Sequence, residues 1–198
     1  MSLLFASLAL NFVAPTKFAP LKFDLGRPSL ASQQVVVYES STPVENIVGR
    51  TSKITGTITG DPAKKVAGGK ISIDLASLVS GNNLRDEHLR SDVWLNTAKF
   101  PYATFESTGV KGAGKDTYVV TGNFSMHGMT HKLSTQITAK YMPESDLTKK
   151  SHFSGDVVQV KAKFKIKLSD YGVTIPPIAK GKVSDDISIS ISVVGTTK

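Results

Sequence analysis

The sequence predicts an all-β domain whose antiparallel strands form either a barrel or a two-sheet sandwich. Seven runs alternate between apolar and polar residues, which is the pattern of strands with one buried face and one wet face. Short turn-like segments separate these runs, and the 16 glycines of the chain suit many tight turns. The sequence contains no internal repeat and no long helical period that competes with this interpretation.

A chain of 198 residues is long enough for one domain and short for two. We expect the folded domain to span residues 21–198. Residues 1–20 then form a leader remnant or an N-terminal extension. Residues 1–14 resemble the apolar core of a secretory signal peptide, although no Lys or Arg precedes them, and they are too short to span a bilayer.

The apolar start of the chain is expected to be buried, because soluble proteins rarely expose such a patch. Leu4, Leu8 and Phe12 share one face of a helix at four-residue spacing. Two partners are open for this short amphipathic helix. One is the mouth of the barrel itself, and the other is a second copy of the chain in a homodimer.

The predicted strands follow one another from residue 34 to the C-terminus, and each carries apolar residues at alternate positions. In chain order they are Gln34–Ser40, Ile54–Thr59, Ile71–Leu75, Tyr118–Met126, Leu133–Ala139, Val160–Leu168 and Ile187–Val193. Lysines occupy alternate positions from Lys161 to Lys167. We expect them to face water and to discourage edge pairing, with an anion-binding stripe as the alternative.

One stretch, Leu84–Ser107, differs in character from the strands around it. A run of charges with leucines on one side predicts a turn of helix. The only tryptophan follows, and then an aromatic-proline-aromatic corner leads into a strand. Residues 75–95 are therefore expected to form a helical insertion over the mouth of the sheet.

The residues that carry most enzymatic and metal chemistry are missing or badly placed. The chain has no cysteine, four histidines without zinc-ligand spacing and no nucleophile elbow. Residues 109–116 resemble a phosphate-binding loop, but Asp116 replaces the required hydroxyl and a strand follows, so a hairpin is expected. The formal net charge of +8 comes from scattered lysines without interleaved aromatics, which argues against nucleic acid as a partner.

Three ordered motifs resemble the YceI-like family of polyisoprenoid-binding proteins. The first is RDEHLRS from Arg85, followed by W-L-x-x-x-K-F-P-x-A-x-F from Trp94. The second is TGNFSMHGMTH over Thr121–His131, and the third pairs DYGV from Asp170 with VSDDI from Val183. The similarity runs from about Leu21 to the C-terminus.

The resemblance implies an elongated, lipocalin-like, up-and-down antiparallel β-barrel of about eight strands, with a short helical insertion over its mouth. It also implies a periplasmic or secreted protein that binds a long-chain polyisoprenoid or similar lipid in an apolar tunnel, without catalysis and without another cofactor. The basic residues Arg85, His88 and Arg90 would meet a phosphate or quinone head group, and the positive charge would allow peripheral contact with an anionic membrane. The expected tunnel lining is Val37, Ile54, Ile73, Trp94, Leu95, Phe100, Phe105, Phe124, Met126, Ile137, Phe164 and Ile189.

Two other classes of function stay open at this point. An enzyme acting on a bound isoprenoid requires a perturbed acid or base inside the barrel. A structural or interaction protein requires a filled barrel and an exposed apolar patch. The periodicity of the strands does not separate a packed core from a tunnel, whereas the family resemblance favours the tunnel.

Overall fold

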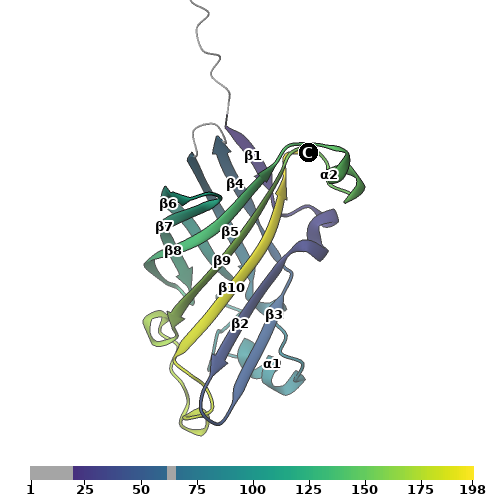
Figure 1. The fold of residues 1–198 in the computed structure, drawn as a ribbon. Coiled ribbons are helices and arrows are strands. Elements are labelled where there is room, and N and C mark those ends of the chain that lie inside the picture. Colours follow the sequence, from purple (N-terminus) through teal and green to yellow (C-terminus); the bar gives the residue numbers. More distant parts are fainter. Residues whose placement is uncertain (1–19, 62–65) are drawn as a thin grey trace, which may run out of the picture.

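The computed structural model describes residues 20–61 and 66–198, and this part of the chain is mostly β, with a few short helices (Figure 1). The strands are β1 (Leu21–Asp24), β2 (Val35–Ser41), β3 (Asn46–Thr51), β4 (Ile54–Asp61), β5 (Val66–Asp74), β6 (Tyr102–Gly114), β7 (Thr117–Met126), β8 (Met129–Met142), β9 (Val157–Lys167) and β10 (Asp186–Thr196). The α-helices are α1 (Asn83–Arg90) and α2 (Asp146–Lys150). The 3-10 helices are η1 (Pro28–Gln33), η2 (Leu75–Ser77), η3 (Ser169–Tyr171) and η4 (Pro177–Ala179).

The ten described strands form a closed barrel with eight strand positions, each antiparallel to its neighbours. The strand β1 pairs with both β4 and β10, which closes the ring. Along β10, Thr196 faces Asp24 of β1 and Ser192 faces Val35 of β2, so β1 and β2 occupy one position in succession. The strands β3 and β4 share the next position in the same way. The predicted eight-stranded antiparallel barrel is confirmed.

A single glutamine bridges the interruption between β1 and β2. The insertion η1 leaves the chain out of register with β10 at this point, and Gln34 is buried there with 2% of its surface exposed. Its amide nitrogen donates to the carbonyl oxygen of Val194 at 2.8 Å, and its amide oxygen accepts from the Val194 N–H at 3.1 Å. The side chain thus supplies the two hydrogen bonds that a strand residue would have made.

A second interruption of the wall lies between β8 and β9. Their ladder runs only from Met142 opposite Val157 to Ile137 opposite Ala162. Below it, the ring of Tyr171 from η3 packs edge-on against Phe124 at 5.5 Å and against His131 at 5.1 Å. A buried aromatic side chain therefore fills the wall where the backbone ladder has ended.

The two ends of the barrel carry different connections (Figure 1). The end drawn at the top, called the upper end here, holds the C-terminus, α2 and the hairpin between β6 and β7. The lower end holds the β2–β3 loop, α1 and the connection from β9 to β10. The predicted helical insertion is confirmed as η2 and α1, and the hairpin expected at residues 109–116 lies between Gly114 and Thr117.

The alternation of side chains places apolar residues inside and polar residues outside. The four lysines from Lys161 to Lys167 are all exposed, as predicted for a solvated strand face. None of the described helices is long and apolar enough to cross a membrane. The predicted amphipathic helix at the start of the chain lies outside the described residues.

Candidate functional site

The barrel contains two apolar cavities that lie end to end. The upper cavity has a volume of about 180 Å³ and the lower cavity a volume of about 370 Å³. Ile73 and Phe124 line both of them, so the cavities meet at these two side chains. The interior is therefore a divided tunnel in which Phe124 stands at the division.

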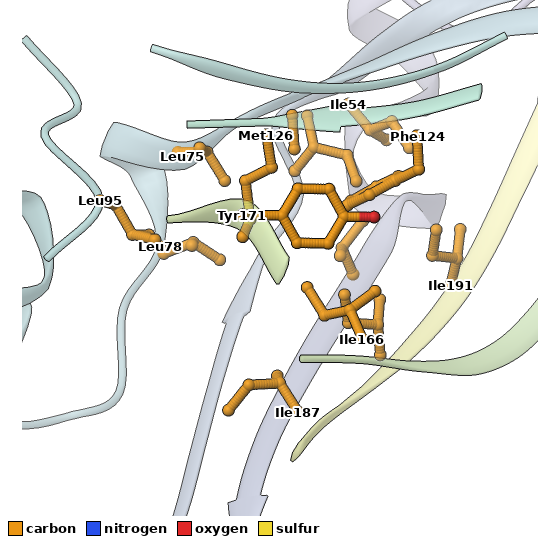
Figure 2. Packing of buried hydrophobic residues seen from close by; sticks show 14 of the residues in the cluster. Ile54, Leu75, Leu78, Leu95, Phe124, Met126, Ile166, Tyr171, Ile187 and Ile191 are labelled. Atoms are coloured by element: carbon orange, nitrogen blue, oxygen red, sulfur yellow. The ribbon is translucent and has the colours of Figure 1, made fainter. Parts of the chain in front are cut away.

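Phe124 is held in this place by other aromatic rings. It is 2% exposed and contacts Phe164 edge-on at 5.9 Å as well as Tyr171 at 5.5 Å. Figure 2 shows the ring of Tyr171 in the middle of the buried cluster, with its hydroxyl end toward Phe124 and Ile191. Edge-to-face packing of this kind is favourable, and it fills the section of the barrel between the cavities.

The upper cavity is lined almost wholly by apolar side chains of the strands. Ile71, Phe105, Ile137 and Phe164 belong to this lining. A Cβ atom at Gly122 would collide with the ring of Phe105. The glycine on β7 thus leaves room for the ring to lie flat against the wall, which keeps the space beyond it open.

The lower cavity opens to the surface between α1 and η4. Its lining includes Leu84 of α1 and Ile178 of η4, whose side chains are 62% and 85% exposed. Trp94 and Leu95 line the same cavity from the segment after α1. A cavity bounded by such exposed residues has its mouth among them, and this mouth is the one that the helical insertion covers.

Polar groups gather at the lower mouth. The guanidinium of Arg85 donates to the carboxylate of Glu45 at 2.9 Å, and both side chains are about one-third exposed. Tyr38 lines the cavity nearby, and burial raises the pKa of its hydroxyl above its ordinary value. The Asp86 carboxylate adds to that rise and Arg85 opposes it. The Tyr38 hydroxyl therefore stays protonated at neutral pH and can donate a hydrogen bond to a ligand.

Asp86 itself has a structural partner. Its carboxylate is 3% exposed and accepts from the Ser80 N–H at 2.8 Å and from the Ser80 hydroxyl at 2.7 Å. These bonds tie α1 to the segment that precedes it. In the described part of the chain, no group of three or more histidines, aspartates and glutamates is placed to hold a metal ion.

Most of the side chains predicted to line a tunnel do line one of the two cavities. Those on the upper cavity are Ile73, Phe105, Phe124, Ile137 and Phe164, and those on the lower cavity are Ile73, Trp94, Leu95, Phe124, Met126 and Ile189. Ile54 is buried at 3% exposure in the surrounding core but bounds neither cavity.

Like Ile54, two other residues predicted for the lining, Val37 and Phe100, bound neither cavity. Val37 points away from the interior, because the alternation along β2 places Val36 and Tyr38 on the cavity. Phe100 lies at the corner before β6, where its ring packs at 4.9 Å against that of His127 in the β7–β8 turn. The proline after it turns the chain before the strand begins, so the ring stays outside the barrel.

Only two of the three basic residues predicted to meet a head group face the lower cavity. Arg85 and His88 line the lower cavity. Arg90 bounds neither cavity, and its guanidinium donates to the carbonyl oxygens of Ala76 at 3.4 Å and Leu78 at 3.3 Å. Residues five apart on an α-helix are rotated by about 140° from one another, so Arg90 does not share the face of Arg85 and supports the insertion instead of facing a ligand.

Sequence reasoning missed two tyrosines. Tyr38 was hidden in a run of three valines, where either parity of the strand looks apolar. The glycine opposite it on β3, Gly49, could have indicated a bulky side chain at position 38, because a Cβ atom at Gly49 would collide with the Tyr38 ring. Tyr171 comes from a short 3-10 helix in a connection, and no periodicity predicts that such a residue enters the wall.

Comparisons with known proteins agree with this architecture. The profile of the YceI-like domain matches residues 28–195. A UPF0312 protein of Azotobacter vinelandii is 36% identical over 150 residues, covering 75% of this chain and 73% of that protein. Protein YceI of Salmonella arizonae is 35% identical over 153 residues, with the same coverage of each chain.

Solved structures share the fold at lower identity. BcnA of Burkholderia cenocepacia matches with a TM-score of 0.70 at 22% identity, covering 84% of this chain and 98% of that chain. A polyisoprenoid binding domain from Saccharophagus degradans, implicated in plant cell wall breakdown, matches with a TM-score of 0.67 at 16% identity. That match covers 91% of this chain and 100% of that chain. At such identities the likeness shows the fold alone.

Proposed function

This chain belongs to the YceI-like domain family, and from that premise we propose that its barrel binds a long-chain polyisoprenoid or a similar amphiphilic lipid. The protein would carry or store this lipid and catalyse no reaction on it. The single observation that carries the proposal is the pair of apolar cavities that meet at Phe124 inside a closed barrel. A packed structural barrel has no need of such a space.

The lining favours one orientation of the lipid. The upper cavity offers apolar side chains from the strands, which suits a hydrocarbon tail. The lower mouth offers Arg85, His88 and the Tyr38 hydroxyl, which suit a phosphate, hydroxyl or quinone head. We therefore place the head group at the lower mouth and the tail above Phe124.

The sizes of the cavities indicate what must move. The lower cavity alone lies within the range of roughly 300–1,000 Å³ that holds drug-sized ligands. A longer chain requires both cavities and therefore a different rotamer of Phe124. Such a chain of about 40 carbon atoms gains about 12 kcal/mol at about 0.3 kcal/mol per heavy atom, which corresponds to nanomolar affinity.

Native mass spectrometry of the purified protein tests the proposal directly. We expect one lipid mass per chain, lost after extraction with organic solvent and restored by incubation with a prenyl lipid. A protein that neither retains nor takes up any member of a series of prenyl lipids of increasing length contradicts the proposal.

The orientation has its own test in Ala139, which lines the upper cavity. Ala139→Phe should weaken binding of the longest prenyl lipids about tenfold by displacing the tail end, and should spare short ones. The matched control is Gln136→Phe, an exposed position on the same strand. Equal losses for short and long lipids would show that the tail does not reach the upper cavity.

A periplasmic or secreted location belongs to the same proposal. It is supported by the resemblance of residues 1–14 to the apolar core of a secretory leader. Fractionation of cells that express the chain with a C-terminal tag tests this part. Recovery of the tagged protein only with the cytoplasmic fraction contradicts it.

A further inference from the structure

The lower mouth is surrounded by apolar side chains that face water. Ile178 of η4 is 85% exposed, Val44 of the β2–β3 loop 76% and Leu84 of α1 62%. Leu84 and Ile178 bound the lower cavity, and Val44 adjoins Glu45, which bounds it as well. We call these three residues the rim.

The rim is held in a fixed arrangement, although its members come from three separate connections. The ion pair of Arg85 with Glu45 joins α1 to the β2–β3 loop. The Ser184 N–H donates to the Ser40 hydroxyl at 2.9 Å, which joins the η4 connection to the end of β2. Leu84 and Ile178 therefore border one opening and Val44 lies beside it next to Glu45, and Figure 1 shows the β2–β3 loop, α1 and the β9–β10 connection at the same lower end of the barrel.

Among the side chains that bound the lower cavity, basic groups outnumber acidic ones. Lys182, Arg85 and His88 bound the lower cavity, and the exposed Lys180 lies two residues beyond Ile178. Among the described residues that bound the cavity, Glu45 is the only acid, and it is paired with Arg85. Exposed apolar side chains next to lysines suit a bilayer with anionic head groups, because the apolar tips insert and the ammonium groups meet the phosphates.

We propose that the rim docks on the surface of an anionic lipid bilayer, so that the lower cavity opens directly into the membrane. The inference deepens the proposed function and rests on it, since a bound lipid would then pass between bilayer and barrel without crossing water. Its partner is the bilayer itself. A second copy of the chain seated on the rim is the competing outcome.

The opposite end of the barrel supplies a matched control. Leu147 of α2 is 73% exposed at the upper end, and the exposed Lys150 follows it three residues later. Neither residue bounds a cavity. The double variant L147D/K150E therefore makes the same two types of change as V44D/K180E, but away from the rim.

The experiment is sedimentation of the purified protein with phosphatidylcholine vesicles that contain phosphatidylglycerol. We expect binding that falls about tenfold in vesicles of phosphatidylcholine alone or at high salt. V44D/K180E should lose binding by about tenfold or more, as should I178D, whereas L147D/K150E should match the wild type. Equal binding by V44D/K180E and the wild type, or an equal loss in the control, overturns the proposal.

Two further measurements separate membrane docking from failure of the proposed function and from a dimer contact at the rim. Uptake of a prenyl lipid from cyclodextrin, without vesicles, should be unchanged in V44D/K180E, because neither residue bounds a cavity. If the wild type fails to take up the prenyl lipid in this assay, the proposed function is wrong. The vesicle sedimentation still tests membrane docking independently. If the wild type ignores vesicles but forms a dimer that V44D/K180E dissociates in light scattering, the rim is a contact between copies and the proposal is wrong.

Discussion

The upper and lower halves of the barrel are built on the same strands but close in different ways. In the upper half, β1 closes the ring by backbone pairing with β4 and β10, and the cavity is bounded by strand side chains. In the lower half, β2 and β3 extend the wall, and helices with charged and exposed apolar residues bound the cavity. The strands thus supply an apolar tube, whereas the connections form its lower mouth.

The largest effect is expected from a charge at Phe124, where the upper and lower cavities meet. Phe124→Arg places an unpaired guanidinium in an apolar interior at a cost of several kcal/mol, and should abolish lipid retention in both halves. Native mass spectrometry measures the retained lipid, and circular dichroism reports whether the variant folds. Val119→Arg on the exposed face of β7 is the control and should retain the lipid. A folded Phe124→Arg protein with a full complement of lipid would show that the chain bypasses this residue.

The next prediction tests how the wall is closed where β1 gives way to β2, at the side-chain bridge of Gln34. Gln34→Ala removes both hydrogen bonds to Val194, which is 4% exposed, and leaves a buried N–H and C=O without partners. At about 1–3 kcal/mol for each of these two unsatisfied groups, the free energy of unfolding should fall by about 2–6 kcal/mol. Denaturant unfolding measures it, with the exposed Gln33→Ala as the near-neutral control. Equal losses for both variants would mean that the bridge contributes nothing specific.

A smaller effect concerns the head group at the lower mouth. Arg85→Gln should weaken binding of a phosphorylated prenyl lipid about tenfold and leave a neutral prenyl lipid unchanged, since the guanidinium pairs only with the anion. Arg90→Gln should not discriminate between the two lipids, because Arg90 donates to backbone carbonyls. Titration by fluorescence with both lipids checks this. Identical losses for both lipids in Arg85→Gln would assign Arg85 a purely structural role beside Glu45.

The smallest effect tests the connection that carries the η4 part of the rim. The Ser169 hydroxyl donates to Asp185 at 2.7 Å and the Ser169 N–H at 2.8 Å. The hydroxyl bond is the main cause that lowers the pKa of Asp185 below its ordinary value of 3.8, with smaller help from the backbone bond and Lys167. A lowered folded pKa means that the stabilisation is present above pH 3.8 and is lost as the pH falls through the folded value.

Asp185→Asn should therefore lower the free energy of unfolding by no more than about 1 kcal/mol at neutral pH, since the side chain is 37% exposed and screened by water. The difference between the variant and the wild type should shrink toward zero in acid. Thermal unfolding at a series of pH values measures it. A difference that stays constant across the series contradicts the assignment to the ionised carboxylate.

The sequence predicted the strands well because strand periodicity is a local property, whereas the choice of a barrel over a sandwich came from the family resemblance. Leu133, Thr135, Ile137 and Ala139 alternate without ambiguity, and all four bound the upper cavity. Val37 was assigned to the wrong face because three consecutive valines fit either parity. Its direction depends on the pairing of β2 with β10, which is not encoded in β2 alone.

The candidate site was harder to predict than the wall. Arg85 and Arg90 look alike in the sequence, and only the packing of α1 decides that one faces the cavity and the other supports the chain. The exposed Ile178 belongs to no periodic segment, so its place at the mouth follows from the fold of a long connection. Local patterns thus determined the container, and tertiary contacts determined its opening.

The filling of the wall by Tyr171 gives the barrel a lateral seam. Below Ile137 and Ala162, β8 and β9 are no longer paired in the ladder, so withdrawal of the Tyr171 ring breaks no rung between them. It gives up the contacts of the ring with Phe124 and His131, whereas the bond from His127 to the Tyr171 carbonyl oxygen holds the backbone in place. The same movement frees space beside Phe124, the residue that must turn for the two cavities to become one. Below the ladder the Thr135 hydroxyl still donates to the Lys163 carbonyl oxygen at 3.1 Å, so a sideways opening of the lower half would cost this one side-chain bond while the backbone ring of the upper half stays paired.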